Sequence, residues 1–241
     1  MRKAVGIIPA RYHSTRFPGK PLANILGQPM VQMVYEKALR AKFLAEVIVA
    51  TDDVRIEKEI KKFGGKVFLT SSLHRTGTER VAEVATHIKS DIILNIQGDE
   101  PLLEPSMLDD LVSVLQDEKI QIATLVEKET DLNLINNSNV VKVVIDNNNF
   151  ALYFSRSPIP YQAQDYFYKH IGIYGFQRNF LLNFVQYSPS SLEKTEKLEQ
   201  LRALEYGVRI KIVCSKYSTF SVDTEEDLDR VIEILKKKEN G

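Results

Sequence analysis

The feature that most constrains the fold is an alternation of short apolar runs with amphipathic stretches along the first half of the 241-residue chain. The apolar runs lie at 4–8, 47–50, 67–69 and 92–96, and helical spacing of apolar residues appears at 31–38, 54–63, 81–88 and 108–115. Strands that are apolar on both faces must be covered on both faces, and helices between them provide that cover. The pattern predicts an α/β fold with a mostly parallel central sheet.

After about residue 121 the apolar runs lie closer together, and "IDNNNFALYF" is typical of a hairpin with an Asn-rich turn. This half is expected to add antiparallel strands to the sheet or to form a smaller antiparallel region. Near the C-terminus, Thr224 and Asp227 form a capping-box-like pair before a helix that ends in lysines. We expect one continuous domain over 1–241, with halves at about 1–120 and 121–220 and a C-terminal helix, 221–238, that returns to the core.

Composition argues against several classes of protein. Lys+Arg and Asp+Glu balance at 32 each, so no basic excess indicates nucleic-acid binding. No apolar run approaches the ~20 residues of a membrane span, and the N-terminal run is too short for a signal peptide. A single cysteine, Cys214, allows no intrachain disulfide. We therefore expect a cytoplasmic protein with no nucleic-acid or membrane partner.

The first apolar run leads into the basic loop "IPARYHSTRFPGKPL", residues 8–22. It fits neither a Walker A loop, because Ser14 replaces the first Gly and Pro21 follows the Lys, nor a three-glycine dinucleotide loop. Arg11, Arg16 and Lys20 nevertheless offer the donors that bind phosphate. From composition alone, a solvated basic loop is an equally good interpretation.

Two acidic segments, "TDD" at 51–53 and "QGDE" at 97–100, also follow predicted strands. Ligands of open parallel sheets bind at the carboxyl ends of the strands, so these loops should meet the basic loop. The combination suits a phosphate ester with a bridging metal ion, and Asp99 is the better candidate ligand. The alternative is a turn in which Asp99 caps the next helix. Asp223 has the same two interpretations, and spacing alone favours the helix cap.

The remaining polar motifs have plain structural interpretations. Thr76 or Thr78 in "HRTGTER" could cap a helix as well as surround a ligand. A lone His170 on an alternating strand is more often structural than catalytic, and Glu199 and Gln200 fall in a charged helix, "LEKTEKLEQLR", where a solvated face is the default. The apolar segment "FQRNFLLNFVQY" is a candidate dimer interface.

In combination the motifs are far more specific than any one of them. "IPARYHSTRFPGKPL", "HRTGTER", "NIQGDEP", "YFSRSPIP", "HIGIYGF", "LEQLR" and "VDTEEDL" occur in this order along nearly the whole chain. Together they resemble the 3-deoxy-manno-octulosonate cytidylyltransferases, or CMP-Kdo synthetases. The resemblance implies a Rossmann-like nucleotidyltransferase core with an antiparallel sugar-binding and dimerisation half. It also implies a cytoplasmic homodimer that makes CMP-Kdo and pyrophosphate from CTP and 3-deoxy-D-manno-octulosonate (Kdo) with Mg²⁺, for lipopolysaccharide synthesis.

The resemblance also assigns roles to individual residues. Those that would hold the triphosphate are Arg11, Ser14, Arg16 and Lys20, and those that would frame the cytosine and ribose are Pro9, Ala10, Arg75, Thr76 and Gly77. Mg²⁺ would be bound by Asp99 and Asp223, which with Lys20 and Arg16 form the implied catalytic set, and both Gln97 and Asp99 would also face the nucleotide. The implied sugar-binding residues are Gln97, Arg156, His170, Tyr174, Glu199 and Gln200, with Arg156 suited to the Kdo carboxylate.

A few positions depart from the family pattern. Arg75 and Thr76 stand where Gln and Ser are common, Lys194 and Thr195 where His and Ile are familiar, and Ser221 where Gly is usual. Two alternatives to Kdo activation are a cytidylyltransferase for another acidic sugar, such as a sialic acid, and a non-catalytic nucleotide-binding protein with the same fold.

Overall fold

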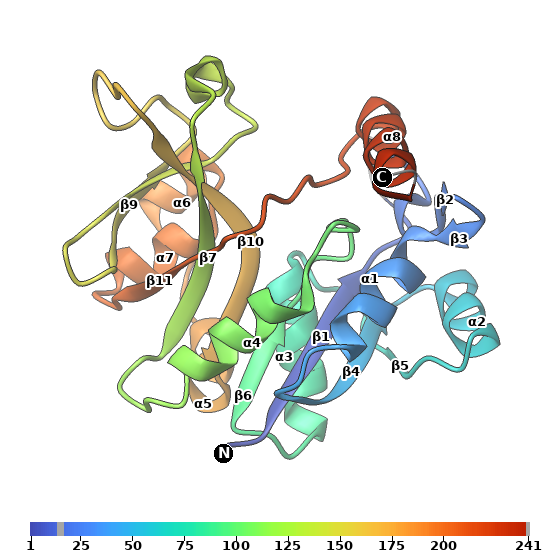
Figure 1. Ribbon diagram of the computed structural model, residues 1–241. Coiled ribbons are helices and arrows are strands. Elements are labelled where there is room, and N and C mark those ends of the chain that lie inside the picture. Colours follow the sequence, from blue (N-terminus) through green and yellow to red (C-terminus); the bar gives the residue numbers. More distant parts are fainter. Residues whose placement is uncertain (14–16, 240–241) are drawn as a thin grey trace.

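The computed structural model describes residues 1–13 and 17–239. A nine-stranded sheet runs through this part of the chain, and its main path has the order β11-β7-β10-β6-β1-β4-β5 (Figure 1). The strands of the sheet are β1 (Ala4–Ala10), β4 (Leu44–Thr51), β5 (Val67–Leu69), β6 (Ile92–Asn95), β7 (Ile122–Glu129), β8 (Lys142–Ile145), β9 (Ala151–Ser155), β10 (Phe167–Gln177) and β11 (Ile210–Cys214). A separate small pair is formed by β2 (Asn24–Ile25) and β3 (Gln28–Pro29).

The predicted α/β fold with a mostly parallel core is confirmed. Strands β6, β1, β4 and β5 run parallel, and so do β7 and β11. Strand β10 is antiparallel to both β6 and β7, so it joins the two parallel groups into one sheet. The carboxyl ends of β1, β4 and β6 therefore share one edge, where the basic and acidic loops follow.

Helices cover both faces of the sheet, as the apolar runs required. The helices are α1 (Met30–Leu39), α2 (Val54–Lys62), α3 (Gly77–His87), α4 (Pro105–Val114), α5 (Arg178–Phe184), α6 (Ser191–Glu196), α7 (Gln200–Glu205) and α8 (Glu225–Glu239), with short 3₁₀ turns η1 (Lys20–Leu22) and η2 (Leu132–Asn136). Adjacent residues of β1 show the two layers: Ile8 packs with α1, α2 and α4, whereas Ile7 packs with α3, α5 and α7. Both side chains are fully buried, which stabilises the fold by about 1.5–3 kcal/mol each.

The second half contains the predicted hairpin and two departures from expectation. Strands β8 and β9 pair antiparallel, and Asn149 in the turn has φ of 57°. The stretch predicted as one charged helix is instead two, α6 and α7, because Lys197 adopts a left-handed conformation and ends α6. The proposed apolar dimer segment packs inward: Phe180 and Phe184 of α5 are buried in the core, so its apolar character needs no partner subunit.

The C-terminal part returns to the first half of the chain. Residues 215–224, here called the strap, run from β11 across the molecule to α8 (Figure 1). Val222 of the strap and Val231 of α8 pack with Ile25 and Met30. The predicted capping pair is confirmed, because Thr224 Oγ1 accepts from Asp227 N at 3.2 Å and Asp227 Oδ2 accepts from Thr224 N at 3.0 Å.

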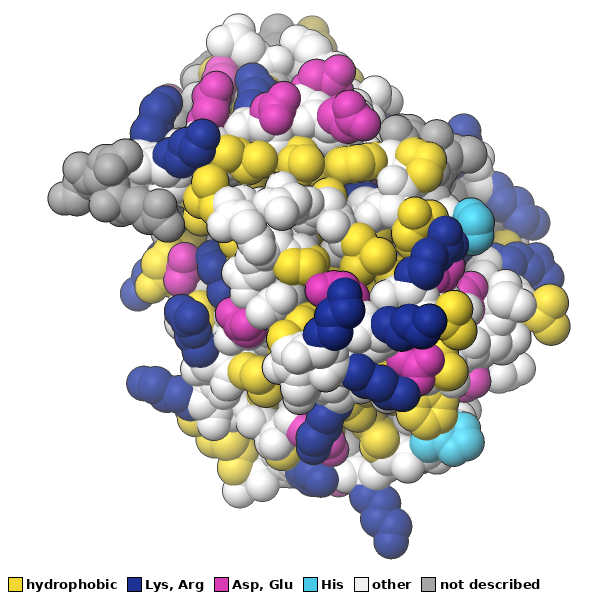
Figure 2. Space-filling model, turned by 90° about the vertical axis from the view of Figure 1, so that its right-hand side faces the viewer, with side chains coloured by type: hydrophobic (Ala, Val, Ile, Leu, Met, Phe, Trp, Pro, Cys, Tyr) yellow, Lys and Arg dark blue, Asp and Glu magenta, His cyan; other side chains and the backbone are white. Residues whose placement is uncertain are grey.

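The composition gave no sign of a membrane or nucleic-acid partner, and two features of the structure concern these partners: the length of its helices and the distribution of its surface charge. Among the described residues, no helix is both long and apolar enough to cross a bilayer. Figure 2 shows one face of the molecule, on which basic and acidic side chains are interspersed.

Candidate active site

Three charged residues that the sequence places far apart meet at the carboxyl edge of the sheet. Lys20 belongs to the basic loop, Asp99 follows β6, and Asp223 belongs to the strap. Lys20 Nζ lies 2.5 Å from Asp99 Oδ2 and 3.3 Å from Asp223 Oδ1. Burial by itself lowers the pKa of Lys20, but the charges and hydrogen bonds of the two carboxylates outweigh it and raise that pKa. A charged ammonium therefore sits between two carboxylates.

The helix-cap alternative is wrong for Asp99 and incomplete for Asp223. Helix α4 begins at Pro105 with Glu104 at its N-cap, so Asp99 caps no helix there. At the start of α8, Asp223 N and Thr224 N both donate to Asp227 Oδ2 at 3.0 Å, so the main chain of Asp223 takes part in the cap, while its carboxylate is directed at Lys20. The carboxylates of Asp99 and Asp223 therefore meet at one charged site.

A compact turn fixes the end of the basic loop. Gly19 has φ of +73°, a conformation that strains other residues, and its N–H donates to Tyr12 O at 2.8 Å. The guanidinium of Arg55 lies 3.2 Å from the centre of the Tyr12 ring, and hydrogen bonds from Arg55 lower the pKa of Asp53 to about 2. Ser14 and Arg16, two of the predicted triphosphate ligands, lie outside the described residues.

The end of β1 is packed closely against the start of α3. Arg11 Nη2 donates to Arg75 O at 2.6 Å, and a Cβ added at Gly77 would lie 3.2 Å from Pro9 Cγ. Burial, and then the charge of Arg80, lower the pKa of Arg11. The predicted nucleotide-framing residues Pro9, Arg75 and Gly77 therefore adjoin one another, and Ala10 follows Pro9 at the end of β1.

The two threonines near the start of α3 have different tasks. Thr76 is the N-cap, because its Oγ1 accepts from Glu79 N at 3.1 Å, which confirms the capping interpretation for this residue. Thr78 instead donates its hydroxyl hydrogen to Glu199. Asn95 Nδ2 donates to Thr78 Oγ1 and Gln97 Nε2 donates to Asn95 Oδ1, each at 3.3 Å.

The hydrogen bonds form a polar row from Gln97 through Asn95 and Thr78 to Glu199. This row joins two predicted sugar-binding residues that are about a hundred positions apart in the sequence. Burial raises the pKa of Glu199. The solvated face predicted for Glu199 and Gln200 is wrong, since Gln200 is only 5% exposed and Glu199 is partly buried.

Two aromatic rings on β10 continue this polar region. The centres of the His170 and Tyr174 rings are 5.4 Å apart, and His170 Nε2 is 2.9 Å from Thr124 Oγ1. Burial lowers the pKa of His170 to about 3, so this imidazole is neutral at neutral pH. Burial, and then the charge of Glu199, raise the pKa of Tyr174 well above its usual value, so its hydroxyl stays protonated.

Arg156 is engaged elsewhere. Its Nε donates to Glu196 O at 2.9 Å and its Nη1 to Ser138 O at 2.8 Å, and Glu196 in turn accepts from Arg156 N at 2.9 Å. These contacts connect β9 with the end of α6. Its predicted role as the ligand of the Kdo carboxylate remains a prediction, and in the conformation described all three of its guanidinium nitrogens donate to main-chain carbonyls.

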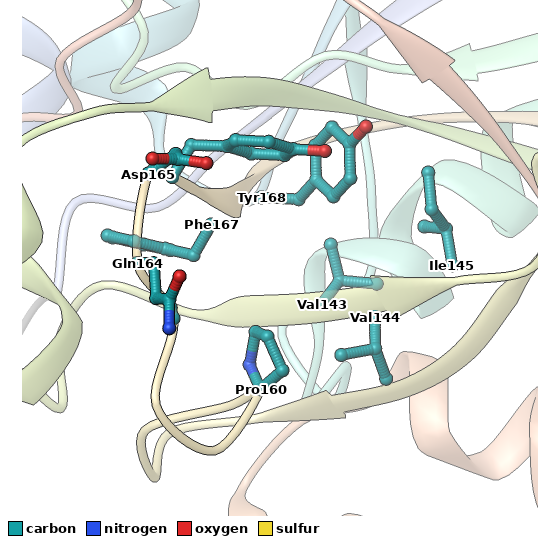
Figure 3. A pocket seen from close by; sticks show the side chains of 10 residues that line it. Val143, Val144, Ile145, Pro160, Gln164, Asp165, Phe167 and Tyr168 are labelled. Carbon is teal, nitrogen blue, oxygen red and sulfur yellow. The ribbon is translucent and has the colours of Figure 1, made fainter.

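Two cavities border the second half, and the larger is also lined by Leu102 and by residues of α8. The larger, about 810 Å³, is bordered by Asp223, other strap residues and His170 and Gly172 of β10, so it opens onto the charged site. The smaller, about 330 Å³, is shown in Figure 3, where Val143 and Val144 of β8 line it with Pro160 and Phe167. Of these two, only the larger cavity borders the predicted catalytic residues.

The charged site has the donor set expected of a magnesium site. Mg²⁺ prefers carboxylate oxygens and commonly takes one or two of them besides phosphate oxygens and water. Asp99 and Asp223 offer two carboxylates, and the ammonium of Lys20 shows that a positive charge is accommodated between them. The residues present therefore fit the ion, although within the described residues no cluster of three or more His, Cys, Asp or Glu side chains surrounds the site.

Sequence reasoning missed several buried polar residues around the site. Asn95 is 1% and Thr124 0% exposed, and Glu100, 2% exposed, accepts a hydrogen bond from Ser221. Burial, and then the charge of Asp99, raise the pKa of Glu100 to about 7. For Asn95 the available signal was a polar residue at the end of an apolar strand, but only the fold shows what each of the three contacts.

Comparison with known proteins places the chain in a family. A family model described as cytidylyltransferase matches residues 5–212. The 3-deoxy-manno-octulosonate cytidylyltransferase of Geotalea uraniireducens is 50% identical over 98% of this chain and 100% of its own length. The chain belongs to the 3-deoxy-manno-octulosonate cytidylyltransferase family. The enzyme of the same name from Syntrophobacter fumaroxidans is also 50% identical, over 97% of both chains.

Solved structures agree with this membership of the 3-deoxy-manno-octulosonate cytidylyltransferase family. A structure of CMP:2-keto-3-deoxy-manno-octonic acid synthetase complexed with CTP superimposes with a TM-score of 0.93, at 41% identity, over 98% of this chain and 99% of the other. A 4-diphosphocytidyl-2C-methyl-D-erythritol synthase from Anaerococcus prevotii has a TM-score of 0.66 at 15% identity, covering 98% and 99% of the two chains, and shares the fold alone. The resemblance noted from the sequence motifs is confirmed.

Proposed function

We propose that this chain transfers CMP from CTP to the 2-hydroxyl of Kdo and releases pyrophosphate. The observation that carries the proposal is the meeting of Lys20, Asp99 and Asp223 at the sheet edge, beside the polar row that ends at Glu199. Relatives that match over nearly their full length bear the name of this activity, and one related structure holds CTP.

The phosphate side of the reaction needs positive charge at fixed positions. Attack of a hydroxyl on the α-phosphorus brings several negative charges together, so catalysis depends chiefly on positioning and charge neutralisation. Lys20 supplies a charged ammonium held by the turn at Gly19, and Arg11 supplies a guanidinium at the end of β1. Arg16 belongs to the same proposed set by resemblance.

Asp99 and Asp223 are the proposed ligands of Mg²⁺. The ion, when bound, would polarise the α-phosphate and neutralise part of its charge. The protein's part is to hold the two carboxylates on one side of the reacting phosphate. The strap brings Asp223 there, and the turn after β6 brings Asp99.

The sugar side is proposed to be the region around the polar row. Kdo carries several hydroxyls and one carboxylate, so its site needs donors and acceptors at fixed places. Gln97, Glu199 and neutral His170 supply both, and Tyr174 and Gln200 adjoin them in the sheet and in α7. Arg156 would reach the carboxylate only if it exchanged one of its main-chain contacts.

The decisive experiment is pyrophosphate release with CTP, Mg²⁺ and Kdo, compared with a sialic acid in place of Kdo and with chelator in place of Mg²⁺. We expect turnover with Kdo alone among the sugars and none with chelator. Turnover with the sialic acid but not with Kdo would favour the acidic-sugar alternative. CTP binding without pyrophosphate release would favour a non-catalytic nucleotide-binding protein.

The cellular setting is also part of the proposal: a cytoplasmic homodimer that supplies CMP-Kdo for lipopolysaccharide synthesis. The β8–β9 hairpin is the proposed dimer surface, because Leu152 is 61% exposed on β9 and β8 borders the small apolar pocket (Figure 3). Light scattering should give the mass of a dimer, and Leu152→Glu should shift it toward the monomer. A monomeric wild-type chain at micromolar concentration would refute this part.

A further inference from the structure

The strap is the least regular element that carries a residue of the charged site. It follows β11 and precedes α8, and between these elements residues 215–224 form no helix or strand. Asp223 nevertheless has to sit beside Asp99, on a segment that no ladder of strand hydrogen bonds holds in register. Some other contacts must therefore fix its place.

Besides the apolar packing of Val222, those contacts include two buried acidic side chains and one main-chain bond. Val222 N donates to Asp99 O at 2.9 Å, which joins the strap to the turn after β6. The residue before Val222 is Ser221, and its Oγ donates to a carboxylate oxygen of Glu100. Further back, Thr219 N donates to Glu127 Oε2 at 3.3 Å.

The buried carboxylates of Glu100 and Glu127 are stabilised chiefly by different partners. Glu127 is 4% exposed and forms an ion pair with Lys169, whose Nζ also donates to Thr219 O at 3.2 Å. Glu100 is 2% exposed and accepts a hydrogen bond from the hydroxyl of Ser221, and the Thr219 side chain and the charge of Lys169 also stabilise its carboxylate. Burying a carboxyl group is costly unless it is hydrogen-bonded, so the contact with Ser221 stabilises both groups where they lie.

We propose that Glu100 is a positioning residue that, through Ser221, holds the strap over the acidic turn and so fixes Asp223 beside Asp99. Glu100 itself contacts neither substrate nor metal in this assignment. Serine occupies a position where the family resemblance leads one to expect glycine, and in this chain its hydroxyl supplies the bond. The activity readout of this inference rests on the proposed function, because it measures Mg²⁺-dependent turnover. The position of the strap can be measured without any substrate.

The test uses a fluorescent reporter on the strap. The chain contains no tryptophan, so Tyr217→Trp, at a side chain that is 46% exposed, places a single indole on the strap. In this background Ser221→Ala should lower the steady-state anisotropy in the absence of CTP, Kdo and metal, because the strap loses one anchor. Ser221→Thr, which keeps the hydroxyl, should restore it. Ser218→Ala, at an exposed serine of the same strap, is the matched control and should change nothing.

Activity supplies the second readout. Ser221→Ala should raise the Mg²⁺ concentration for half-maximal turnover roughly tenfold, the order of effect expected from losing one buried hydrogen bond. Glu100→Ala should do the same, and the double variant should be no worse than either single one, because both remove one contact. Glu100→Gln keeps an acceptor for Ser221 and should retain most of the activity.

Three results would overturn the proposal. One is unchanged anisotropy in Ser221→Ala, and another is a loss in the double variant equal to the sum of the single losses. The third is an inactive Glu100→Gln with a rigid strap, which would make Glu100 a direct ligand. If the wild-type chain failed to turn over Kdo, the anisotropy series would still decide the positioning role, so the two failures are distinguishable.

Discussion

Replacing Lys20 by alanine removes the cation that lies between Asp99 and Asp223. The side chain is only 15% exposed, and its ammonium contacts both carboxylates. In the free protein the variant leaves two like charges close together. In the complex with CTP it removes a positive charge from the phosphates. These two consequences change different measured quantities.

The catalytic consequence follows from the work of a fixed donor. A preorganised group that stabilises developing charge is worth about 3 kcal/mol, so kcat should fall by about a hundredfold or more. The consequence for the free protein follows from the distances. The two carboxylate oxygens that Lys20 contacts lie within about 6 Å of each other, where two unit charges repel by about 3 kcal/mol at an effective dielectric constant of 20. Because Asp223 is 39% exposed, solvent will reduce this repulsion. A divalent cation should then bind the free variant at least as tightly as the wild type.

The assay measures kcat and KM for CTP by pyrophosphate release and, separately, the affinity of the substrate-free protein for Mg²⁺ by calorimetry. Lys61→Ala is the matched control, since Lys61 forms an ion pair with Glu57 at 2.6 Å on the surface of α2 and is 64% exposed. It should leave both quantities unchanged. Circular dichroism checks that Lys20→Ala remains folded.

Two results would refute the reasoning. A tenfold rise in KM for CTP with unchanged kcat would mean that Lys20 contributes to ground-state binding alone. A marked loss of Mg²⁺ affinity in the substrate-free variant would mean that Lys20 organises the two carboxylates for the metal instead of occupying its place.

Three further predictions concern single residues. Asp99→Asn should abolish turnover while the thermal midpoint stays near that of the wild type, and near-normal activity at ordinary Mg²⁺ would remove its role as metal ligand. Because the pKa of His170 is depressed to about 3 from 6.5, the unfolded chain binds a proton that the folded chain does not. The stability that neutral His170 provides is therefore complete above pH 6.5 and is lost as the pH falls toward 3. In urea unfolding, the free energy of unfolding of His170→Gln should fall less between pH 6.5 and 4.5 than that of the wild type. An equal fall would contradict the assignment. Arg156→Ala should lower the free energy of unfolding by about 1–3 kcal/mol, because carbonyls on two segments lose a donor; an unchanged stability with a raised KM for Kdo would instead place Arg156 on the sugar.

Local sequence patterns were sufficient for most of the first half. The boundaries of α2 and β5 were close to the predicted ones because each of these elements has a clear apolar period and polar ends. The hairpin of β8 and β9 was recognisable from its Asn-rich turn. The helix break at Lys197 was missed, because nothing in "LEKTEKLEQLR" indicates a left-handed residue.

Local patterns likewise identified some residues of the functional site but not the contacts between them. Lys20 and Asp99 were identifiable as candidates because each follows a predicted strand, and strands of a parallel sheet end at one edge. The spacing around Asp223 favoured a helix cap, and its main-chain N–H does take part in the cap of α8, but the contact of its carboxylate with Lys20 was visible only in the fold. The contact of Thr78 with Glu199 joins α3 to the start of α7, and no local pattern relates residues so distant.

By itself, the sequence determined the α/β class, the edge at which charged loops gather and, through its ordered motifs, the family. These depend on periodicity and on local residue types, which are properties of short segments. The tertiary structure alone decided that Lys20 sits between two carboxylates and that a strap held at Glu100 carries one of them. Such contacts join segments up to some two hundred residues apart, and their geometry is set by packing across the whole sheet.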